Sequence, residues 1–579
     1  MATNDQGPGE AGVSGALADL AEAYDAFETP TGEYLLKIVA PTVLLFLALV
    51  VVTLVLPVPA YLAVLVVLFG VLGIVTAVLY PKLVRDWRRR EIEDSFYMGI
   101  THLTVLSTTN ISRMEVFEKL AQEREYGEFA VEIDRLVQLV EVWNQSLDDA
   151  CRRRSRRIPS DAMSDFLDRL AYSLASGQEL SDFLSNEQHV ILQNYKTIYQ
   201  GTLENLEVMK DLYLSMILSM TFALVFATVL PVLTGNDPAM TVGAVILLFV
   251  LVQTGFFVTI RAIAPNDPVW YHPGETAPPS ERRLRRAVAV GVGGTVLVGA
   301  LVAADLFGHT PVSLVDVLPG DTTPLGIHAA VTVTPLLVPA VALRRAEKRI
   351  TARDEEFPSF IRALGATESA KQSTTSAVLR DLRRKDFGVL TEDIDNLYRR
   401  LNVRIRPERA WAYFTAETRS YLIQKYSQMY LVGRQMGGDP KELGELISRN
   451  MNEVLQLRER RHQATITLIG LLYGITAAAS FAFYIGIQVV AILADMSLDL
   501  DAGSTAAAQL INTASYDIPF IKFLVLVVIL FNALLSSLMI RTADGGHKVN
   551  SYLHFVLLTW IGATVGLLVQ LMVSSLLDI

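Results

Sequence analysis

Nine apolar segments constrain the fold of this chain more than any other feature, because each is long enough to cross a lipid bilayer. A helix needs about 20 consecutive, mostly apolar residues to span the hydrocarbon core. The predicted segments are 38–57, 60–80, 212–233, 239–260, 287–307, 325–343, 465–493, 518–540 and 551–576. They cannot all be core helices of a soluble protein of 579 residues, 51% of which are hydrophobic. The sequence therefore predicts an all-α polytopic membrane protein with about nine transmembrane helices.

The basic residues indicate which ends of these helices face the cytoplasm. The two long connections, 82–211 and 344–464, contain 17 and 24 basic residues, and the connection 261–286 contains five. The connections at the opposite ends contain no Lys or Arg: 58–59, 234–238, 308–324 and 494–517. Basic residues concentrate on the cytoplasmic side of membrane proteins. We therefore expect a multi-pass protein of the cell membrane whose N-terminus is cytoplasmic and whose C-terminus is external.

The predicted domain organisation follows from these assignments. Residues 1–34 form an acidic cytoplasmic tail with seven acids and no Lys or Arg, unlike the basic start of a cleavable signal peptide. The first apolar segment is therefore expected to act as its own insertion signal. The other parts are transmembrane hairpins at 35–81, 212–260 and 287–343, cytoplasmic helical domains at 82–211 and 344–464, a cytoplasmic linker at 261–286, and three C-terminal transmembrane helices at 465–579.

The two cytoplasmic domains resemble each other in sequence. "REYGEFAVEIDRL" at 124–136 is echoed by "KDFGVLTEDIDNL" at 385–397, an offset of 261 residues. Further matches at this offset are Phe96 with Phe357, Leu103 with Leu364, Leu170 with Leu431, and Gly177 with Gly438. Such a long-period match predicts a parallel duplication, in which one helical bundle occurs twice on the same side of the membrane.

The repeated stretch is predicted to be an amphipathic helix, because its apolar residues recur at i, i+3 and i+4. A glycine precedes each apolar stripe and suits a helix end or a tight turn, since Gly tolerates positive φ. The residues assigned to the repeated scaffold are Gly127, Ile133, Asp134, Leu136 and Gly177 in the first copy, and Gly388, Ile394, Asp395, Leu397 and Gly438 in the second.

The sequence contains no motif for catalysis, a cofactor or a metal. It lacks the GxxxxGK[ST] loop that cradles phosphates and the HExxH metal motif. Cys151 is the single cysteine, which rules out paired-cysteine metal motifs and an intrachain disulfide. Ser, His and Asp are scattered without a nucleophile motif. We therefore expect a protein that is not an enzyme and that has no cofactor and no metal site.

The interiors of the apolar segments lack charges, whereas transporters and ion pumps place charged residues there. A channel or transporter is therefore disfavoured, and a membrane transporter is kept only as the alternative from another functional class. The uncharged polar residues in these segments, predicted to form interhelical hydrogen bonds, are Gln253, Gln488, Asn532 and Gln570. Two GxxxG patterns, Gly470–Gly474 and Gly562–Gly566, permit close helix contacts either within the chain or between the two copies of a homodimer.

The two cytoplasmic domains differ in charge. The first has 17 basic and 23 acidic residues, and the second has 24 basic and 17 acidic residues. A basic domain suits the docking of an acidic protein partner; a solvated face with local ion pairs is the alternative. The docking candidates are Arg380, Arg383, Arg384, Lys385, Arg399, Arg400, Arg404, Arg406 and Arg409. No aromatic residues interleave with these clusters, so nucleic acid is not expected as a partner.

Other basic residues of the second domain lie close to the apolar segments. We expect them to meet anionic membrane lipid, which attracts juxtamembrane Lys and Arg. These residues are Arg344, Arg345, Lys348 and Arg349, and later Arg458, Arg460 and Arg461.

Three stretches carry a resemblance to a known family. They are "FYMGITHLTVLSTTNISRMEVF" (96–117), "YGEFAVEIDRLVQLVEVWNQSLDDACRRRSRR" (126–157) and "DFLDRLAYSLASGQELSDFL" (165–184). The chain resembles the platform proteins of type II secretion and type IV pilus machines, the type II secretion F family. The long form with two domains is similar to the archaeal branch, and within it to archaellum platform proteins. The second copy departs from the family pattern in its middle, at "NVRIRPERAWAYF".

The resemblance implies a role without enzymatic activity. Platform proteins of this family bind a cytoplasmic hexameric secretion ATPase, whose motion is thought to move pilin-like or archaellin subunits from the membrane into the filament. An adhesive type IV pilus is the alternative to an archaellum. The resemblance therefore implies a non-enzymatic platform that couples an ATPase to filament assembly or rotation.

Overall fold

The computed structural model describes Tyr24 and residues 31–55, 60–234, 238–272, 279–306, 325–372, 374–500 and 518–577. Its regular elements in these ranges are helices, and the only extended pairing there is an isolated bridge between Trp270 and Ser420. The predicted all-α class is thus confirmed. Nearly all of the predicted acidic tail and the whole segment 308–324, which the sequence predicts to be external, lie outside the described residues. The chain divides into two units, Met1–Gln193 with Gln435–Gly438, and Asn194–Arg434 with Asp439–Ile579.

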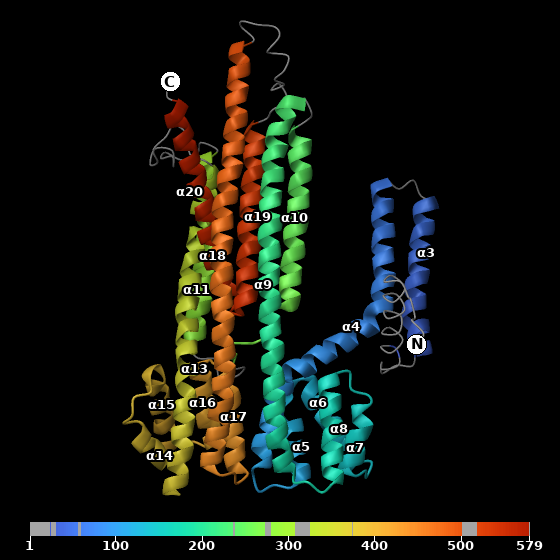
Figure 1. Cartoon of the computed structure of the whole chain (residues 1–579), viewed down its shortest axis with the longest axis vertical. Coiled ribbons are helices and arrows are strands. Elements are labelled where there is room, and N and C mark those ends of the chain that lie inside the picture. Colours follow the sequence, from blue (N-terminus) through green and yellow to red (C-terminus); the bar gives the residue numbers. More distant parts are fainter. Residues whose placement is uncertain are drawn as a thin grey trace, which may run out of the picture. The chain divides into compact units, whose positions relative to one another are not determined.

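Unit 1 contains an apolar helical hairpin and a bundle of shorter helices (Figure 1). The hairpin pairs α3 with the first part of α4. The elements are α2 Thr31–Tyr34, η1 Leu35–Val39, α3 Ala40–Val55, α4 Ala60–Ser107, α5 Arg113–Ala121, η2 Arg124–Tyr126, α6 Glu128–Glu141, α7 Leu147–Ser155, α8 Asp161–Ala175 and the start of α9 Leu180–Thr234.

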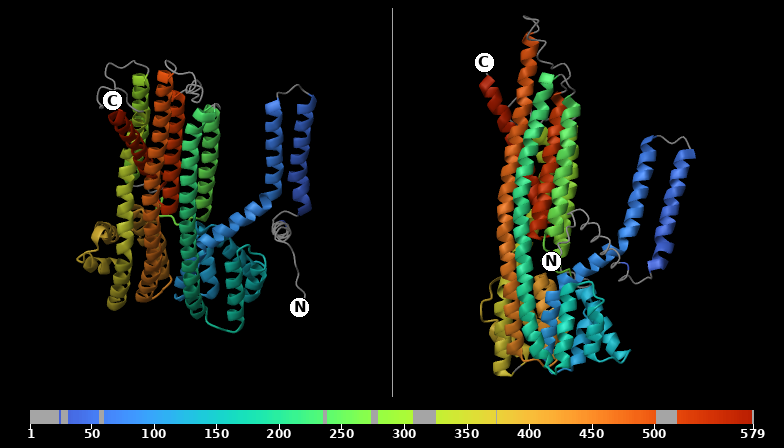
Figure 2. Two further views of the ribbon diagram at one scale, coloured as in Figure 1. Left: turned by 45° about the horizontal axis from the view of Figure 1, so that its top comes forward. Right: turned by 45° about the vertical axis from the view of Figure 1, so that its right-hand side comes forward.

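Unit 2 contains the remainder of α9 and a bundle of long helices joined to a second group of short ones. Two views agree that α13 and α18 run from the short helices into the long bundle (Figures 1 and 2). The elements are α10 Pro238–Ile263, α11 Pro279–Leu306, α12 Leu325–Val333, η4 Thr334–Leu336, α13 Leu337–Lys371, α14 Thr375–Leu382, η5 Gly388–Leu390, α15 Thr391–Asn402, α16 Pro407–Thr418, α17 Tyr421–Gln435, α18 Pro440–Leu500, α19 Ile518–Asp544, η6 Lys548–Asn550 and α20 Ser551–Leu577.

Seven helices in the described part of the chain are long and apolar enough to cross a membrane. They contain the third to ninth predicted segments, within α9, α10, α11, the α12–α13 run, α18, α19 and α20. The first two predicted segments correspond to α3, of 16 residues, and to the first part of α4. The polytopic membrane class is confirmed, and nine is an approximate number of spans.

The predicted borders between polar domains and transmembrane segments fall inside uninterrupted helices. The borders at 81/82, 211/212, 343/344 and 464/465 lie within α4, α9, α13 and α18 respectively. The 61 residues of α18 correspond to a rod about 90 Å long at the usual helical rise. The helical backbone therefore continues across each of these four borders.

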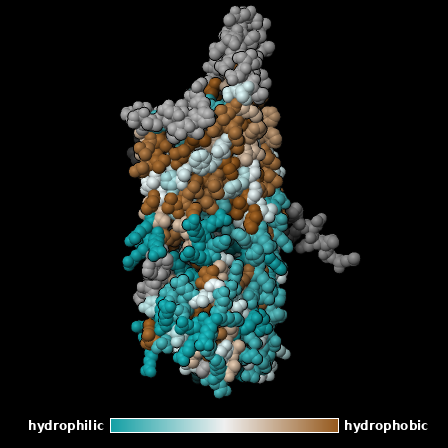
Figure 3. All heavy atoms as spheres, turned by 90° about the vertical axis from the view of Figure 1, so that its left-hand side faces the viewer, coloured by the Kyte–Doolittle hydropathy of each residue, from teal (hydrophilic) through white to brown (hydrophobic). Residues whose placement is uncertain are grey.

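Four of the long helices of unit 2 share one apolar core. Side chains of α9, α10, α18 and α19 pack together there, among them Tyr213, Phe249, Leu472 and Val528. Other large apolar side chains of the same bundle point outward, such as Phe226 at 66% exposure and Val296 at 68%. Figure 3 shows apolar side chains gathered in a band above a hydrophilic surface. An outward apolar band of this kind suits contact with lipid, which accepts apolar side chains but no unsatisfied backbone.

The duplicated elements adopt matching backbone conformations in the two units. Gly127 has φ 55° and Gly388 has φ 53°. The stripes that follow are buried in both copies, with Ile133, Leu136, Ile394 and Leu397 all fully inaccessible. Asp134 and Asp395 are half-buried at the borders of these stripes.

The offset between the copies shortens by one residue after this helix. Asn144 and Arg404 both have positive φ, 55° and 61°, and occupy the same position in the turns that follow α6 and α15. The second turn is one residue shorter, because it lacks a counterpart of Trp143. Gly437, with φ 83°, and not Gly438, therefore corresponds to Gly177, with φ 79°. Leu170 is likewise matched by Tyr430 rather than by Leu431, which corrects the uniform register that the sequence predicts.

The two GxxxG patterns have different surroundings. A Cβ on Gly562 would lie 2.6 Å from Ile529, and one on Gly566 would lie 2.5 Å from the Tyr484 ring. This pair is therefore used for close packing of α20 within the chain. A Cβ on Gly470 or Gly474 would meet no atom of the described residues within 4 Å. The pair in α18 is thus open in the monomer.

Candidate functional site

The predicted docking cations lie on three short helices of the second polar domain and on the turns between them. Helices α14, α15 and α16 pack in succession, and α14 also packs against α13. Helix α15 buries Ile394 and Leu397 and presents its charged residues on the opposite side, as expected for an amphipathic helix. Eight of the nine candidates have exposed side chains, and the exception is Arg400, which is half-buried.

Arg400 is held within its own domain. Both terminal nitrogens donate to the carboxylate of Glu417 in α16, with Nη1 lying 3.0 Å from Oε2. Its guanidinium also lies 5.1 Å from the centre of the Tyr413 ring. These contacts join α15 to α16, so Arg400 serves the packing of the domain and is not available to a partner in this arrangement.

The other candidates differ in how far they are neutralised. Asp395 lies between Arg383, at 3.2 Å, and Arg399, at 2.7 Å, so two cations share one carboxylate. Lys385 lies over the Phe387 ring at 5.4 Å. Among the described residues, no carboxylate lies within ion-pair distance of the remaining five, which are Arg380, Arg384, Arg404, Arg406 and Arg409. The exposed surface of α14–α16 therefore keeps an excess of positive charge.

A second feature joins this domain to the bundle of long helices. Arg458 of α18 binds Asp267, in the segment after α10, through two bonds of 2.8 and 2.7 Å. Its Nη1 also donates to Asp354 Oδ2 of α13 at 3.1 Å. The Arg458 side chain is only 15% exposed, and paired, buried guanidinium groups fix geometry because they bind carboxylates in a planar fork. We call Arg458, Asp267 and Asp354 the arginine clamp.

Backbone bonds and a tryptophan extend the arginine clamp. Tyr271 N donates to Arg419 O at 2.8 Å, and Tyr421 N donates to Val269 O at 3.1 Å. These bonds tie the segment after α10 to the start of α17. Trp270 Nε1 donates to Glu347 of α13 at 3.1 Å. The segment after α10 is thus attached to both α13 and the second polar domain.

Helices α13 and α18 approach each other closely in the polar domain. A Cβ on Gly365 would lie 2.1 Å from the carbonyl oxygen of Pro440, and one on Gly444 would lie 2.8 Å from that of Ile361. Both contacts are with backbone, which cannot move aside as a flexible side chain can. The absence of side chains at these two positions therefore permits the tight pairing of the two helices.

Burial shifts the pKa of two carboxyl groups in this domain. Desolvation raises the pKa of Asp354 to about 7, although Arg458 and the hydroxyl of Ser420 oppose the shift. Desolvation also raises the pKa of Asp393 to about 6, against the effect of Arg353. The clamp holds one arginine between two carboxylates, and this excess negative charge makes protonation of Asp354 easier.

Sequence reasoning missed a buried acid that both copies share. Glu132 of α6 and Asp393 of α15 occupy the same place in the repeat, and each is 3% exposed. Glu132 binds Arg154 of α7, whereas Asp393 binds Arg353 of α13 at 2.8 Å. The signal is visible in the sequence, because an acid directly precedes the matched isoleucine in both copies. The arginine partners could not be predicted in this way, because Arg154 and Arg353 lie at unrelated positions of the repeat.

The predicted lipid contacts are only partly compatible with the structure. Arg344, Arg345, Lys348, Arg349 and Arg460 are exposed. The prediction is wrong for Arg458, whose side chain forms the arginine clamp with two distant carboxylates. Arg461 of α18 is only 4% exposed and donates to backbone carbonyls at the end of α19, so it does not lie on the outer surface.

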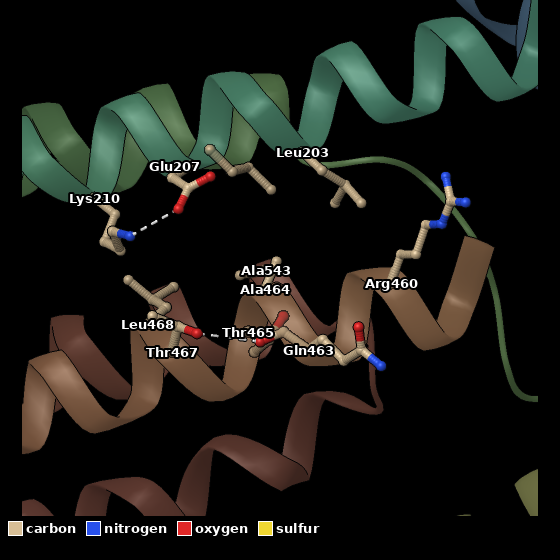
Figure 4. Close-up of a pocket in the computed structure, with 11 residues that line it drawn as sticks. Leu203, Glu207, Lys210, Arg460, Gln463, Ala464, Thr465, Thr467, Leu468 and Ala543 are labelled. Atoms are coloured by element: carbon tan, nitrogen blue, oxygen red, sulfur yellow. Dashed lines mark hydrogen bonds and ion pairs between the residues drawn. The ribbon is translucent and has the colours of Figure 1, made fainter. Parts of the chain in front are cut away.

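A groove beside α9 is lined by residues that are engaged in local contacts. It has a volume of about 330 Å³ and lies between α9 and α18 (Figure 4). Lys210 pairs with Glu207 at 3.3 Å, and the hydroxyls of Thr465 and Thr467 donate to backbone carbonyls of their own helix. Within the described ranges, no group of three or more His, Cys, Asp or Glu side chains is placed to hold a metal ion.

The comparisons with known proteins identify relatives over almost the whole chain. The family model "Type II secretion system (T2SS), protein F" matches residues 100–228, which include the first polar domain from the end of α4 into α9. Flagella accessory protein J of Methanococcus voltae is 32% identical over 94% of this chain and 96% of its own length. The protein of that name from Methanocaldococcus jannaschii is 31% identical over the same shares. No solved structure matches the chain.

Identity at this level over nearly the full length of both chains establishes common descent and a common fold. The family is one of structural membrane components and not of enzymes, in line with the lack of a catalytic motif. This chain therefore belongs to the archaeal flagella accessory protein J family and carries a type II secretion system protein F domain.

Proposed function

We propose that this protein is the membrane platform of an archaellum and that its second polar domain docks a cytoplasmic hexameric secretion ATPase. Family membership supports a platform in a type IV filament machine. The observation that carries the docking assignment is the excess of exposed, unneutralised cations on α14–α16. Complementary charge speeds and orients the association of protein partners.

The second polar domain is also built to transmit force. Helix α18 continues from it through the membrane bundle as one helix, and α13 continues to Leu337, where η4 and α12 precede it. At Gly365 and Gly444 the two helices pair so closely that neither position has room for a side chain. The arginine clamp attaches the segment after α10 to the same pair. A movement imposed on α14–α16 would therefore reach several transmembrane helices together. Filament subunits, pilin-like or archaellin, are the proposed recipients of that movement.

The orientation that fits this role places the N-terminus and both polar domains in the cytoplasm. The C-terminus then lies outside. The distribution of basic residues supports this orientation, since the connections at the other end of the helices contain none. Cysteine labelling of intact cells at a residue of the 308–324 segment, after replacement of Cys151, would test it.

The docking assignment can be tested by charge reversal at exposed positions. Arg380, Arg384 and Arg409 are exposed and have no ion-pair partner among the described residues, so their replacement by Glu leaves the packing of the domain intact. We expect the triple variant to insert in the membrane normally and to bind the purified ATPase at least about tenfold more weakly, because like charges would then face each other.

The matched control is a triple charge reversal in the first polar domain, at Arg152 and Arg153 of α7 and at Arg156, which directly follows that helix. These side chains are also exposed. ATPase binding should survive this change. Unaltered binding by the second-domain variant, or an equal loss in both variants, would show that the α14–α16 surface is not the docking site.

We further propose that the protein acts as a homodimer through the open face of α18. Gly470 and Gly474 are exposed, and glycine in a helix interior costs about 1 kcal/mol relative to alanine. Close approach of a second copy of α18 would compensate this cost. Replacement of both by Leu should shift the detergent-solubilised protein from dimer to monomer in light scattering, whereas a Leu at Gly201 should not.

An adhesive type IV pilus remains the other assignment within the same family of machines. The two assignments differ in the filament subunit that depends on this protein. Deletion of the gene in its host should abolish archaella and swimming while surface attachment continues. A transporter is disfavoured by the family and would require substrate flux in proteoliposomes that contain this protein alone.

A further inference from the structure

The cytoplasmic-domain end of the long bundle in unit 2 contains a basic cleft that the platform role does not explain. Its volume is about 650 Å³. Its walls are the end of α10 and the segment after it, Arg461 at the end of the polar part of α18, and the end of α19 with the turn that leads to α20. The positively charged residues that line it are Arg261, Arg461, Arg541 and Lys548.

These four cations are poorly neutralised. Arg461 donates to the carbonyl oxygens of Ala543 and Thr542, at 2.6 and 3.1 Å, and Arg541 donates to that of Gly546 at 3.2 Å. No carboxylate lies within ion-pair distance of the four among the described residues. Asp267 also lines the cleft, but both of its oxygens are bound by Arg458 of the arginine clamp.

The buried position of Arg461 makes this excess charge informative. Only 4% of the residue is exposed, and its guanidinium lies so close to Gly545 that a Cβ there would be 2.6 Å from Nη1. Carbonyl dipoles at the end of α19 offset part of its charge. A buried cation without a counter-ion is otherwise expensive, so an anion in the cleft would stabilise the arrangement.

The pKa of His547 is also affected by the positive charge of the cleft. His272 and His547 stack with their ring centres 6.5 Å apart. Burial lowers the pKa of His547, and the neighbouring His272, Arg541 and Lys548 lower that pKa further. Protonation of His547 is therefore opposed by positive charge from two sides of the cleft. The remaining acids nearby are engaged, since Glu347 accepts bonds from Trp270 Nε1 and His547 N.

The position of the cleft at the edge of the apolar band indicates which kind of anion it binds. Arg261 directly follows the predicted apolar segment 239–260, and Arg541 directly follows the predicted apolar segment 518–540. Both cations thus lie at the level where lipid headgroups meet water. Basic pockets between transmembrane helices at this level bind the phosphates of anionic headgroups.

We propose that this cleft binds the headgroup phosphate of an anionic membrane lipid through Arg261, Arg541 and Lys548. The buried Arg461 adds positive charge to the same cleft. The lipid headgroup would then lie between the α19–α20 turn and the segment after α10, which the arginine clamp binds. This assignment does not depend on the ATPase-docking surface, which lies on other helices.

The test uses the full-length protein in a neutral detergent and the water-soluble lipid dioctanoyl phosphatidylglycerol. Binding would be measured by calorimetry, with dioctanoyl phosphatidylcholine and inorganic pyrophosphate as competitors. Arg261→Gln with Lys548→Gln removes two exposed cations of the cleft. We expect phosphatidylglycerol binding to weaken about tenfold in this variant. The matched control, Arg282→Gln with Arg283→Gln, removes two exposed cations at the start of α11 that do not line the cleft, and should bind as the native protein does.

Three results would overturn the proposal. The first is equal affinity for phosphatidylglycerol and phosphatidylcholine. The second is an equal loss in the cleft and control variants, which would indicate only general attraction to basic surface. The third is tight binding of pyrophosphate that phosphatidylglycerol does not displace, which would make the occupant a soluble anion. Arg261→Gln alone, at an exposed position, repeats the test if the double variant folds poorly.

Discussion

Gln253 of α10 donates a hydrogen bond to Asn532 of α19 inside the transmembrane bundle, although 279 residues separate them in the chain. The same amide group lies 3.2 Å from the hydroxyl of Tyr213 in α9. Asn532 in turn donates to Thr476 of α18 at 3.1 Å. Four helices of one core are thus joined by a polar network, which fixes their register where apolar contacts alone are permissive.

Removing either amide should therefore destabilise the bundle. Gln253→Leu and Asn532→Leu are each expected to lower the free energy of unfolding in detergent by about 1 kcal/mol, because the remaining partner is left unsatisfied in an apolar core. The double variant should lose less than the sum of the two. Strict additivity in this double-mutant cycle would show that the two amides do not interact.

Arg458→Met should release the segment after α10 from the second polar domain. Two buried carboxyl groups would lose their shared cation, at a cost of about 3 kcal/mol. Protease should then cut within 264–272 faster, while the membrane segments stay protected. Arg458→Lys should be intermediate, since one ammonium cannot bind two carboxylates in a fork. Arg460→Met, two residues away and exposed, serves as the control; equal cleavage in all of these proteins would argue against the clamp.

The stability of the second polar domain should fall as pH rises from 5 to 8. The pKa of Asp354 is raised to about 7 in the folded protein, above an unfolded value near 3.9. The group therefore stabilises the fold at low pH, and this contribution is lost as pH rises through the folded pKa, by up to about 1.4 kcal/mol per unit. Asp354→Asn, which imitates the protonated form, should flatten the pH profile of thermal unfolding. A profile parallel to that of the native protein would contradict this.

Gly365→Ala should destabilise the protein, although alanine normally favours a helix by about 1 kcal/mol over glycine. The new Cβ would meet the backbone of Pro440 at 2.1 Å and force α13 and α18 apart. Gly201→Ala in α9 is the matched control, because a Cβ there meets nothing within 4 Å. Thermal unfolding should show a decrease in the first variant and a slight increase in the second; an increase in both would rule out the close contact.

The membrane class and the helices could be derived from the sequence because their signals are local. Apolar length identifies a span, and the spacing of Ile133 and Leu136 identifies a buried stripe, without knowledge of the rest of the chain. The duplication could also be predicted from the sequence, because a glycine stands at the same place in both copies. The structure explains this, since Gly127 and Gly388 share the same positive φ. The one-residue shortening after α15 was not visible, since the missing counterpart of Trp143 lies in a turn whose sequence has diverged.

Which charges are available to a partner was decided by the tertiary structure. Arg400 and Arg404 look alike in the sequence. In the structure Arg400 is bound to Glu417, whereas Arg404 is exposed and no carboxylate of the described residues lies within ion-pair distance of it. Arg458 meets Asp267 from 191 residues away. The pattern of one segment determines whether that segment forms a helix and which side is apolar; the pairing of a cation depends on which distant carboxylate the packing of helices brings within about 3 Å.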